Sequence, residues 1–143
     1  MKRWLLLAIL LAMVLSACSS ATSNTTPGHK AKMASVSQMP SAVQKAPTRV
    51  HEAYRFAVAN PDLLKHIPCY CGCGAMGHTS NYACYVKEVK PDGSVNFDDH
   101  ALGCSLCVDI TQDARRMLDE GKLAQDIRAA IVANYSQFGP PNQ

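Results

Sequence analysis

The run PCYCGCG at residues 68–74 constrains this chain more than any other feature, because it places Cys69, Cys71 and Cys73 on alternate residues. In an extended backbone, the middle thiol of such a run points away from the other two. Gly72 and Gly74 relax this restriction, since glycine reaches backbone dihedrals that are closed to other residues. We therefore expect an irregular loop that can turn all three sulfur atoms toward one point.

More cysteines and histidines follow the loop within the length of one small domain. Cys104 and Cys107 are three residues apart near the start of a predicted helix, so both side chains should share one face of that helix. A helix N-terminus also favours the thiolate form that binds metals. We predict a thiolate-rich metal site whose ligands are Cys69, Cys71, Cys73, Cys84, Cys104 and Cys107, with His78 and His100 as second-rank ligands.

The start of the chain predicts export and lipid attachment. A basic start at Lys2 and Arg3 precedes an apolar run that is too short to span a membrane comfortably. Residues 15–18, Leu-Ser-Ala-Cys, then resemble the bacterial lipobox, in which cleavage falls before the cysteine. We predict a signal peptide over residues 1–17, a lipid on Cys18 and a location at the extracytoplasmic face of a bacterial membrane.

The remaining boundaries follow from composition and charge. Residues 18–46 are polar and read as a flexible linker, residues 47–138 as the cysteine-rich domain, and residues 139–143 as a disordered tail. Loss of Lys2 and Arg3 would leave basic and acidic side chains nearly balanced, which argues against a nucleic-acid partner. The membrane association that we expect comes from the lipid alone.

The residue types narrow the choice of metal. Six thiols exceed the four that a structural zinc ion needs, and soft thiolate sites select Cu(I) or Zn(II). Copper is a natural extracytoplasmic cargo, and Met76 adds a soft side chain beside the loop. Our order is copper, then zinc, then an iron–sulfur cluster. The predicted role is capture of the ion or its transfer to a metal-trafficking protein, without enzymatic activity.

Two alternatives stay open at this point. Six cysteines outside the cytoplasm also fit three disulfides, which would make the domain a stapled binding module. A bond between cysteines two residues apart is strained, so each loop cysteine would have to pair with a later one. The second alternative is a thiol–disulfide redox protein that uses Cys104 and Cys107, although no βαβ pattern surrounds them.

Hydrophobic periodicity predicts a mainly α-helical small domain with a Cys/Gly-rich loop. A short β-hairpin of residues 82–89 and 95–97 is the alternative to a helix that starts at Ser80 or Asn81, and we favour the helix. Thr48 is the expected N-cap of the first helix, and Asn60 is the expected cap of the next. The predicted helices cover residues 49–59, one turn after Pro61, a long segment from Asp98 or Asp99 to Glu120, and residues 122–135.

The hexapeptide PCYCGC at residues 68–73 resembles the motif of the PCYCGC-motif lipoprotein family of bacteria. The similarity runs from about Pro61 to Tyr135 and implies a lipid-anchored, extracytoplasmic small domain whose activity is uncharacterised. The glycine expected between the last two cysteines is Ser105 here, which leaves both thiols in place. The other matching segments are Gly77-His78-x-Ser80-Asn81 with Cys84, Asp99-His100, Cys104-x-x-Cys107, and Gly121-Lys122 with Ile127-Arg128.

Overall fold

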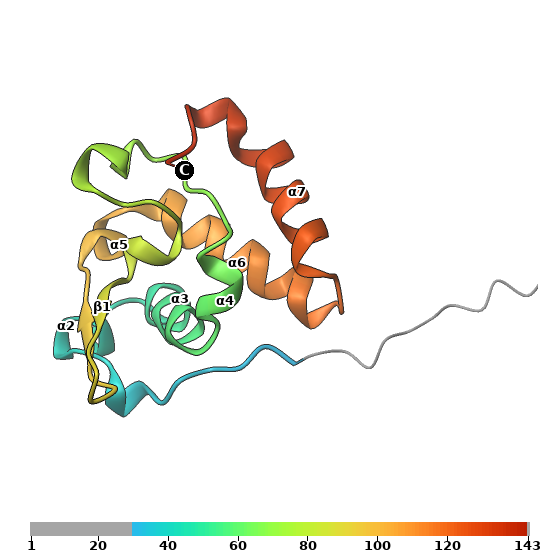
Figure 1. Ribbon diagram of the computed structural model, residues 1–143. Helices are drawn as coiled ribbons and strands as arrows, with labels where there is room; N and C mark the ends of the chain where they lie inside the picture. The colour runs from blue at the N-terminus through green and yellow to red at the C-terminus, as the bar shows by residue number, and fades with distance from the viewer. Residues whose placement is uncertain (1–29, 143) are drawn as a thin grey trace, which may run out of the picture.

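The computed structural model describes residues 30–142, and the predicted signal peptide and Cys18 lie outside this range. The described part is mainly α-helical, as predicted, and contains one short antiparallel hairpin (Figure 1). Within residues 30–142, no helix combines the length and the apolar character that crossing a bilayer requires. The elements in chain order are η1 Val36–Gln38, α2 Ser41–Gln44, α3 Thr48–Ala59, α4 Pro61–Leu64, η2 Cys73–Met76, η3 Tyr82–Cys84, β1 Val86–Val89, β2 Val95–Phe97, α5 His100–Gly103, α6 Ser105–Asp119, α7 Ala124–Tyr135 and η4 Ser136–Phe138.

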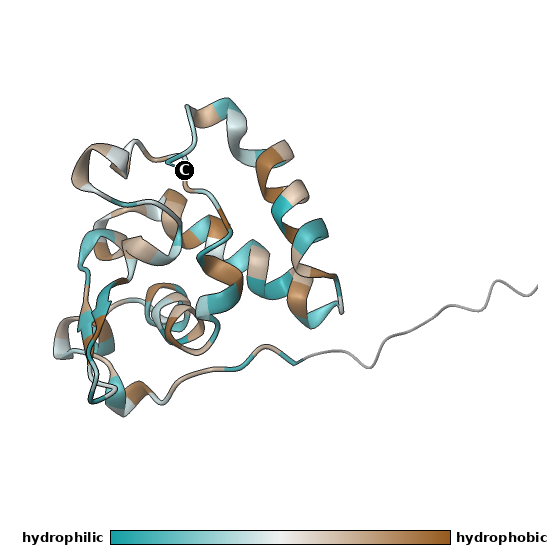
Figure 2. Ribbon diagram, viewed as in Figure 1, coloured by the Kyte–Doolittle hydropathy of each residue, from teal (hydrophilic) through white to brown (hydrophobic). Residues whose placement is uncertain are grey.

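Helix α6 forms the centre of the domain and packs against both α3 and α7. Its apolar stripe includes Ile110 and Ala114, which are fully buried. Tyr54 of α3 and Ile131 of α7 are also fully buried and belong to the same core. Figure 2 shows the resulting alternation of apolar and polar residues along α6 and α7. This core fixes the position of Cys107, which lies in the first two turns of α6.

The predicted helix over residues 80–89 is wrong, and the hairpin alternative is correct. Only Tyr82–Cys84 makes a turn of 3₁₀ helix, and Val86–Val89 then pairs antiparallel with Val95–Phe97. The β-branched valines on both sides of the Pro91-Asp92-Gly93 turn favour strands over helix. The pairing is irregular between Val86 and Glu88, which is a bulge at Lys87.

The predicted helix from Asp98 or Asp99 to Glu120 is interrupted. Helix α5 ends at Gly103, and Cys104 has extended dihedrals of φ −115° and ψ 100° before α6 begins at Ser105. Glycine is a poor helix former, which makes residue 103 a natural place for the break. The prediction that Cys104 and Cys107 share a helical face is therefore wrong, because Cys104 is the N-cap of α6 rather than part of it.

The other helix boundaries lie close to their predicted positions. Thr48 is the first residue of α3 rather than its N-cap, a position that Pro47 occupies. Asn60 is the N-cap of α4, with Pro61 at the first helical position, as predicted. Helix α7 starts at Ala124, two residues later than expected.

The segment of residues 30–46 was expected to be a flexible linker, and the structure contradicts this. It runs along α3, where Arg55 Nε donates to the carbonyl of Ala34 at 2.7 Å and Asn60 Nδ2 donates to the carbonyl of Lys32 at 2.8 Å. Met39 and Val43 are buried in the core. The apolar residues of the segment 30–46 are widely spaced among polar ones. The sequence of this segment therefore shows no hydrophobic periodicity that would predict packing.

The end of the chain is also ordered as far as Asn142, in contrast to the expected disordered tail. The backbone N–H of Asn142 donates to the carbonyl of Cys69 at 3.0 Å. Figure 1 shows the C-terminus beside the loop that follows α4. The last residues therefore belong to the domain and cover its cysteine-rich loop.

The packing of residues 30–46 predicts that replacing Met39 destabilises the domain more than replacing Met76 does. We expect Met39→Ala to lower the free energy of unfolding by about 2 to 3 kcal/mol, because it leaves a cavity in the core. Met76→Ala is the matched control, since the Met76 side chain is 62% exposed and should cost less than about 0.5 kcal/mol. Urea denaturation of the reduced protein measures both. Equal small effects would show that residues 30–46 do not pack on the domain.

Candidate metal centre

The loop that carries the first three cysteines is shaped by two left-handed glycines. Gly72 has φ +77° and Gly77 has φ +85°, a region that favours glycine over other residues. The 3₁₀ turn Cys73–Met76 lies between them. Gly72 has the predicted role, whereas Gly74 lies within the 3₁₀ turn and Gly77 provides the second reversal. The loop therefore coils back on itself, and its thiols face inward.

Three sulfur atoms form a nearly equilateral triangle. The Sγ atoms of Cys69 and Cys71 are 3.4 Å apart, those of Cys69 and Cys107 are 3.4 Å apart, and those of Cys71 and Cys107 are 3.5 Å apart. Two corners come from the loop, and the third comes from α6. Cys69 and Cys107 are fully buried, whereas Cys71 is half-buried. We call this set the sulfur triangle.

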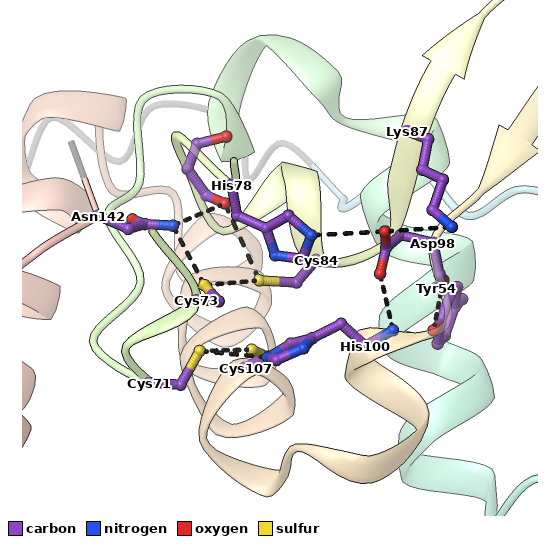
Figure 3. Close-up of polar contacts among 11 residues, drawn as sticks. Tyr54, Cys71, Cys73, His78, Cys84, Lys87, Asp98, His100, Cys107 and Asn142 are labelled. Carbon is purple, nitrogen blue, oxygen red and sulfur yellow. Dashed lines mark hydrogen bonds and ion pairs between the residues drawn. The ribbon is translucent and has the colours of Figure 1, made fainter. Parts of the chain in front are cut away.

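A second group of ligand atoms lies next to the sulfur triangle. The Sγ atoms of Cys73 and Cys84 are 3.7 Å apart, and one nitrogen from each of His78 and His100 lies within 4.8 Å of both sulfurs. Nε2 of His100 is also 3.4 Å from Sγ of Cys71, so the two groups adjoin (Figure 3). We call Cys73, His78, Cys84 and His100 the mixed nest.

These spacings suit a metal ion held by sulfur and nitrogen. Two sulfurs bound to one tetrahedral ion with bonds of about 2.3 Å would be about 3.8 Å apart. The closest sulfur–sulfur distances of 3.4 to 3.7 Å come near that spacing. A disulfide bond is about 2.05 Å long, and all six cysteines among residues 30–142 are free thiols.

His78 carries the clearest sign of an absent partner. Its imidazole is buried, and its Nδ1 atom has no hydrogen-bond partner within the described residues. Its other nitrogen, Nε2, lies 3.4 Å from Oδ2 of Asp98 (Figure 3). A metal-binding histidine commonly donates its second ring N–H to a carboxylate, which leaves the first nitrogen free to coordinate. The His78–Asp98 pair has this arrangement.

Asp98 is held in place by several elements. Its Oδ1 accepts the backbone N–H of His100 at 2.8 Å, and its backbone carbonyl accepts the hydroxyl of Tyr54 at 2.8 Å. Lys87, at the hairpin bulge, places Nζ 3.7 Å from Oδ2. The sequence analysis places Asp98 at the start of a helix. It does bind the first turn of α5, but it also orients His78, which the sequence analysis missed because Asp98 is distant from His78 in the chain.

The buried sulfurs differ strongly in their readiness to ionise. Hydrogen bonds from Cys107 and then Cys84 lower the pKa of Cys69 well below its ordinary value. The hydrogen bonds to Cys69 and Cys84, together with burial, raise the pKa of Cys107 well above its ordinary value. Burial is the largest cause of the raised pKa of Cys71 and of Cys73. One thiolate thus suppresses ionisation of its neighbours, and a bound cation would allow several thiolates to coexist.

A buried network of hydrogen bonds holds the backbone of Cys107 in place. The backbone carbonyl of Cys107 accepts the hydroxyl of Tyr85 at 2.9 Å and the amide Nδ2 of Asn81 at 3.2 Å. Thr111, one turn later on α6, donates to Oδ1 of Asn81 at 2.6 Å. Such fully satisfied buried networks hold a site rigid. They tie the segment that carries Cys84 to the helix that carries Cys107.

Asn142 closes the loop from the opposite end of the chain. Its Oδ1 accepts the backbone N–H of Cys69 at 2.7 Å, and its Nδ2 donates to the carbonyl of Ser80 at 3.3 Å. The same Nδ2 donates to Sγ of Cys73 at 3.4 Å (Figure 3). Nothing in the composition of the last five residues indicated this role. The contact is visible only once the chain is folded.

The structure brings together seven of the eight predicted ligands and leaves Cys104 apart. Cys104 belongs to none of the groups whose ligand atoms lie within 4.8 Å of one another. The cluster contains an odd number of sulfurs, so three disulfides would require Cys104 to move into it. Of the two cysteines that the redox alternative names, Cys107 is fully buried in the cluster and Cys104 is half-buried outside it.

The fold and the site together define a small helical domain built around a thiolate–imidazole cluster that can hold a metal ion. The chain belongs to the family described as "Protein of unknown function with PCYCGC motif", whose model matches residues 7–143. The expected family is thereby confirmed. No curated protein matches the chain, and no solved structure does.

The His78–Asp98 pair yields a prediction about affinity. We expect Asp98→Asn to weaken metal binding by about 10- to 100-fold, because the amide no longer provides the carboxylate that orients His78. Asp99→Asn is the matched control, since Asp99 is exposed and its side chain makes no capping hydrogen bond. Competition with a chelating dye measures both affinities. If the two variants bound equally well, Asp98 would not support a ligand.

Proposed function

We propose that this protein is a lipid-anchored, extracytoplasmic binding protein for a soft metal ion, with Cu(I) favoured and Zn(II) next. Its role is to capture the ion and pass it to a metal-trafficking partner. The observation that carries this proposal is the convergence of five thiols and two imidazoles in one largely buried cluster, in which Nδ1 of His78 has no hydrogen-bond partner among residues 30–142. A buried imidazole nitrogen without a hydrogen-bond partner costs free energy, so packing alone does not explain its position among thiols.

The ligand chemistry supports a soft ion. Thiolate sulfur favours Cu(I) and Zn(II), whereas Mg²⁺, Ca²⁺ and Mn²⁺ favour carboxylate and carbonyl oxygen. The cluster offers sulfur and imidazole nitrogen, and Asp98 is engaged with His78, Lys87 and the backbone of His100. A structural zinc site closes with four ligands. Seven residues of the cluster offer a donor, which exceeds that number.

One edge of the cluster is open enough for exchange. Cys71 and His100 are half-buried, and Gly72, Gly74 and Met76 next to Cys71 are exposed. In the proposed transfer, the bond between the ion and the Cys71 thiolate breaks as a bond to a thiolate of the partner forms. The oxidation state of the ion does not change. Met76 provides a soft thioether beside this route.

Metal content tests the proposal directly. We expect the full-length protein, purified reduced and then exposed to copper or zinc, to retain the ion. Cys71→Ser and Cys107→Ser should each lower the affinity at least tenfold, since each removes one corner of the sulfur triangle. Cys104→Ser is the control and should bind as the unmodified protein does, because Cys104 lies outside the cluster. Elemental analysis with chelator competition measures all four proteins.

The outcomes separate the proposal from its rivals. A preference for copper would support capture and delivery, and a preference for zinc would support a more structural role. Absence of bound metal with the cysteines oxidised would contradict the proposal and favour the disulfide-stapled module. Loss of metal in Cys104→Ser alone would contradict the assigned ligands.

The anchor yields a separate prediction. We expect Cys18→Ala to release the protein from the membrane fraction, because the lipid is the only membrane attachment that we propose. Cys104→Ala is a matched control that should leave the protein in the membrane fraction. Fractionation of cells that express each variant, followed by immunoblotting, measures the distribution. Retention of the Cys18 variant would show that another segment holds the protein at the membrane.

A further inference from the structure

The cluster holds more ligand atoms than one ion can use. A tetrahedral zinc or similar ion takes about four donors. Seven residues of the cluster offer a ligand atom, and five of them are thiols. The surplus donors are not on the surface: Cys69, Cys84 and Cys107 are all fully buried. A single ion would therefore leave buried thiols and an imidazole nitrogen without a partner.

The seven donors can be assigned to two adjoining sets that overlap in space, since Nε2 of His100 lies 3.4 Å from Sγ of Cys71. The sulfur triangle has edges of 3.4 to 3.5 Å and draws on the loop and α6. The mixed nest consists of Cys73, His78, Cys84 and His100, whose ligand atoms all lie within 4.8 Å of one another. The two sets differ in composition, because the triangle supplies sulfur alone and the nest supplies two sulfurs and two nitrogens.

Cys84 occupies a special position between the two sets. Its ligand atom lies within 4.8 Å of the ligand atoms of the other six residues, because Cys84 belongs to each of the three overlapping groups. It belongs to the mixed nest, where its Sγ is 3.7 Å from that of Cys73. It can also serve as the fourth ligand above the triangle. A thiolate sulfur has enough lone pairs to bind two ions at once.

Resting on the proposed function, we infer that the centre holds two metal ions bridged by the thiolate of Cys84. The first ion is bound by Cys69, Cys71, Cys107 and Cys84. The second ion is bound by Cys73, His78, His100 and Cys84. With one donor shared, the seven residues supply both ions with four ligands each and leave no donor of the cluster over.

Electrostatics favours this arrangement over a single ion. Five thiolates at these distances would repel one another, and each added cation would offset part of that repulsion. The second ion would also engage Nδ1 of His78, which has no hydrogen-bond partner within the described residues. Asp98 already holds His78 at its other nitrogen, 3.4 Å away, in the orientation that such binding needs.

Titration of the reduced full-length protein with Co²⁺, a paramagnetic substitute for Zn²⁺, tests this inference. We expect two equivalents to bind, with sulfur-to-cobalt charge-transfer absorption rising through both. A bridging thiolate couples the two spins, so the electron paramagnetic resonance signal of the first equivalent should weaken as the second binds. Cys104→Ser should behave in the same way, since Cys104 lies outside the cluster.

Variants of one set at a time locate the two ions. We expect His78→Gln and Cys73→Ser to bind a single uncoupled Co²⁺ at the triangle, and Cys69→Ser to bind a single uncoupled Co²⁺ at the nest. These variants leave Cys84 intact, so the test does not depend on replacing this fully buried residue. Saturation of the unmodified protein at one ion would overturn the two-ion centre but leave the proposed function standing. Two ions without spin coupling would overturn the bridge. If neither Co²⁺, Zn²⁺ nor Cu(I) bound, both proposals would fail.

Discussion

The structure depends on the contact between the cysteine-rich loop and helix α6. Cys107 is fixed by the packing of α6 against α3 and α7 and by hydrogen bonds from Tyr85 and Asn81 to its carbonyl. The Sγ atoms of Cys69 and Cys71, in the loop, lie 3.4 and 3.5 Å from the Sγ atom of Cys107. A flexible loop alone could not hold three thiols at such distances, so the rigid helix provides the reference point around which the loop is ordered.

The same contact creates an electrostatic problem that a cation resolves. Hydrogen bonds from its neighbours lower the pKa of Cys69, and the thiolate of Cys69 in turn raises the pKa of Cys107, so one ionised thiol keeps its neighbours protonated. Binding of a metal ion releases those protons and converts mutual suppression into shared coordination. A domain of this size has a modest hydrophobic core, so the free energy of metal binding would also stabilise its fold.

Local signals in the sequence predicted much of this arrangement. The alternating thiols with Gly72 predicted the inward-facing loop, and helical periodicity predicted α3, α6 and α7. The sequence did not predict the contacts between segments that are far apart in the chain. Asn142 reaches Cys69, and Asp98 reaches His78, through the tertiary fold. The misplacement of Cys104 has a local cause, since the pattern of apolar residues continues across the break at Gly103 although the backbone does not.

X-ray absorption spectroscopy of the metal-loaded, full-length protein shows which atoms bind the ion. At the K-edge of the bound copper or zinc, we expect a first shell dominated by sulfur at about 2.3 Å, together with imidazole nitrogen at about 2.0 to 2.1 Å. The imidazole contribution should decrease in the His78→Gln variant. A first shell of oxygen and nitrogen without sulfur would contradict the account, because it would place the ion outside the cysteine cluster.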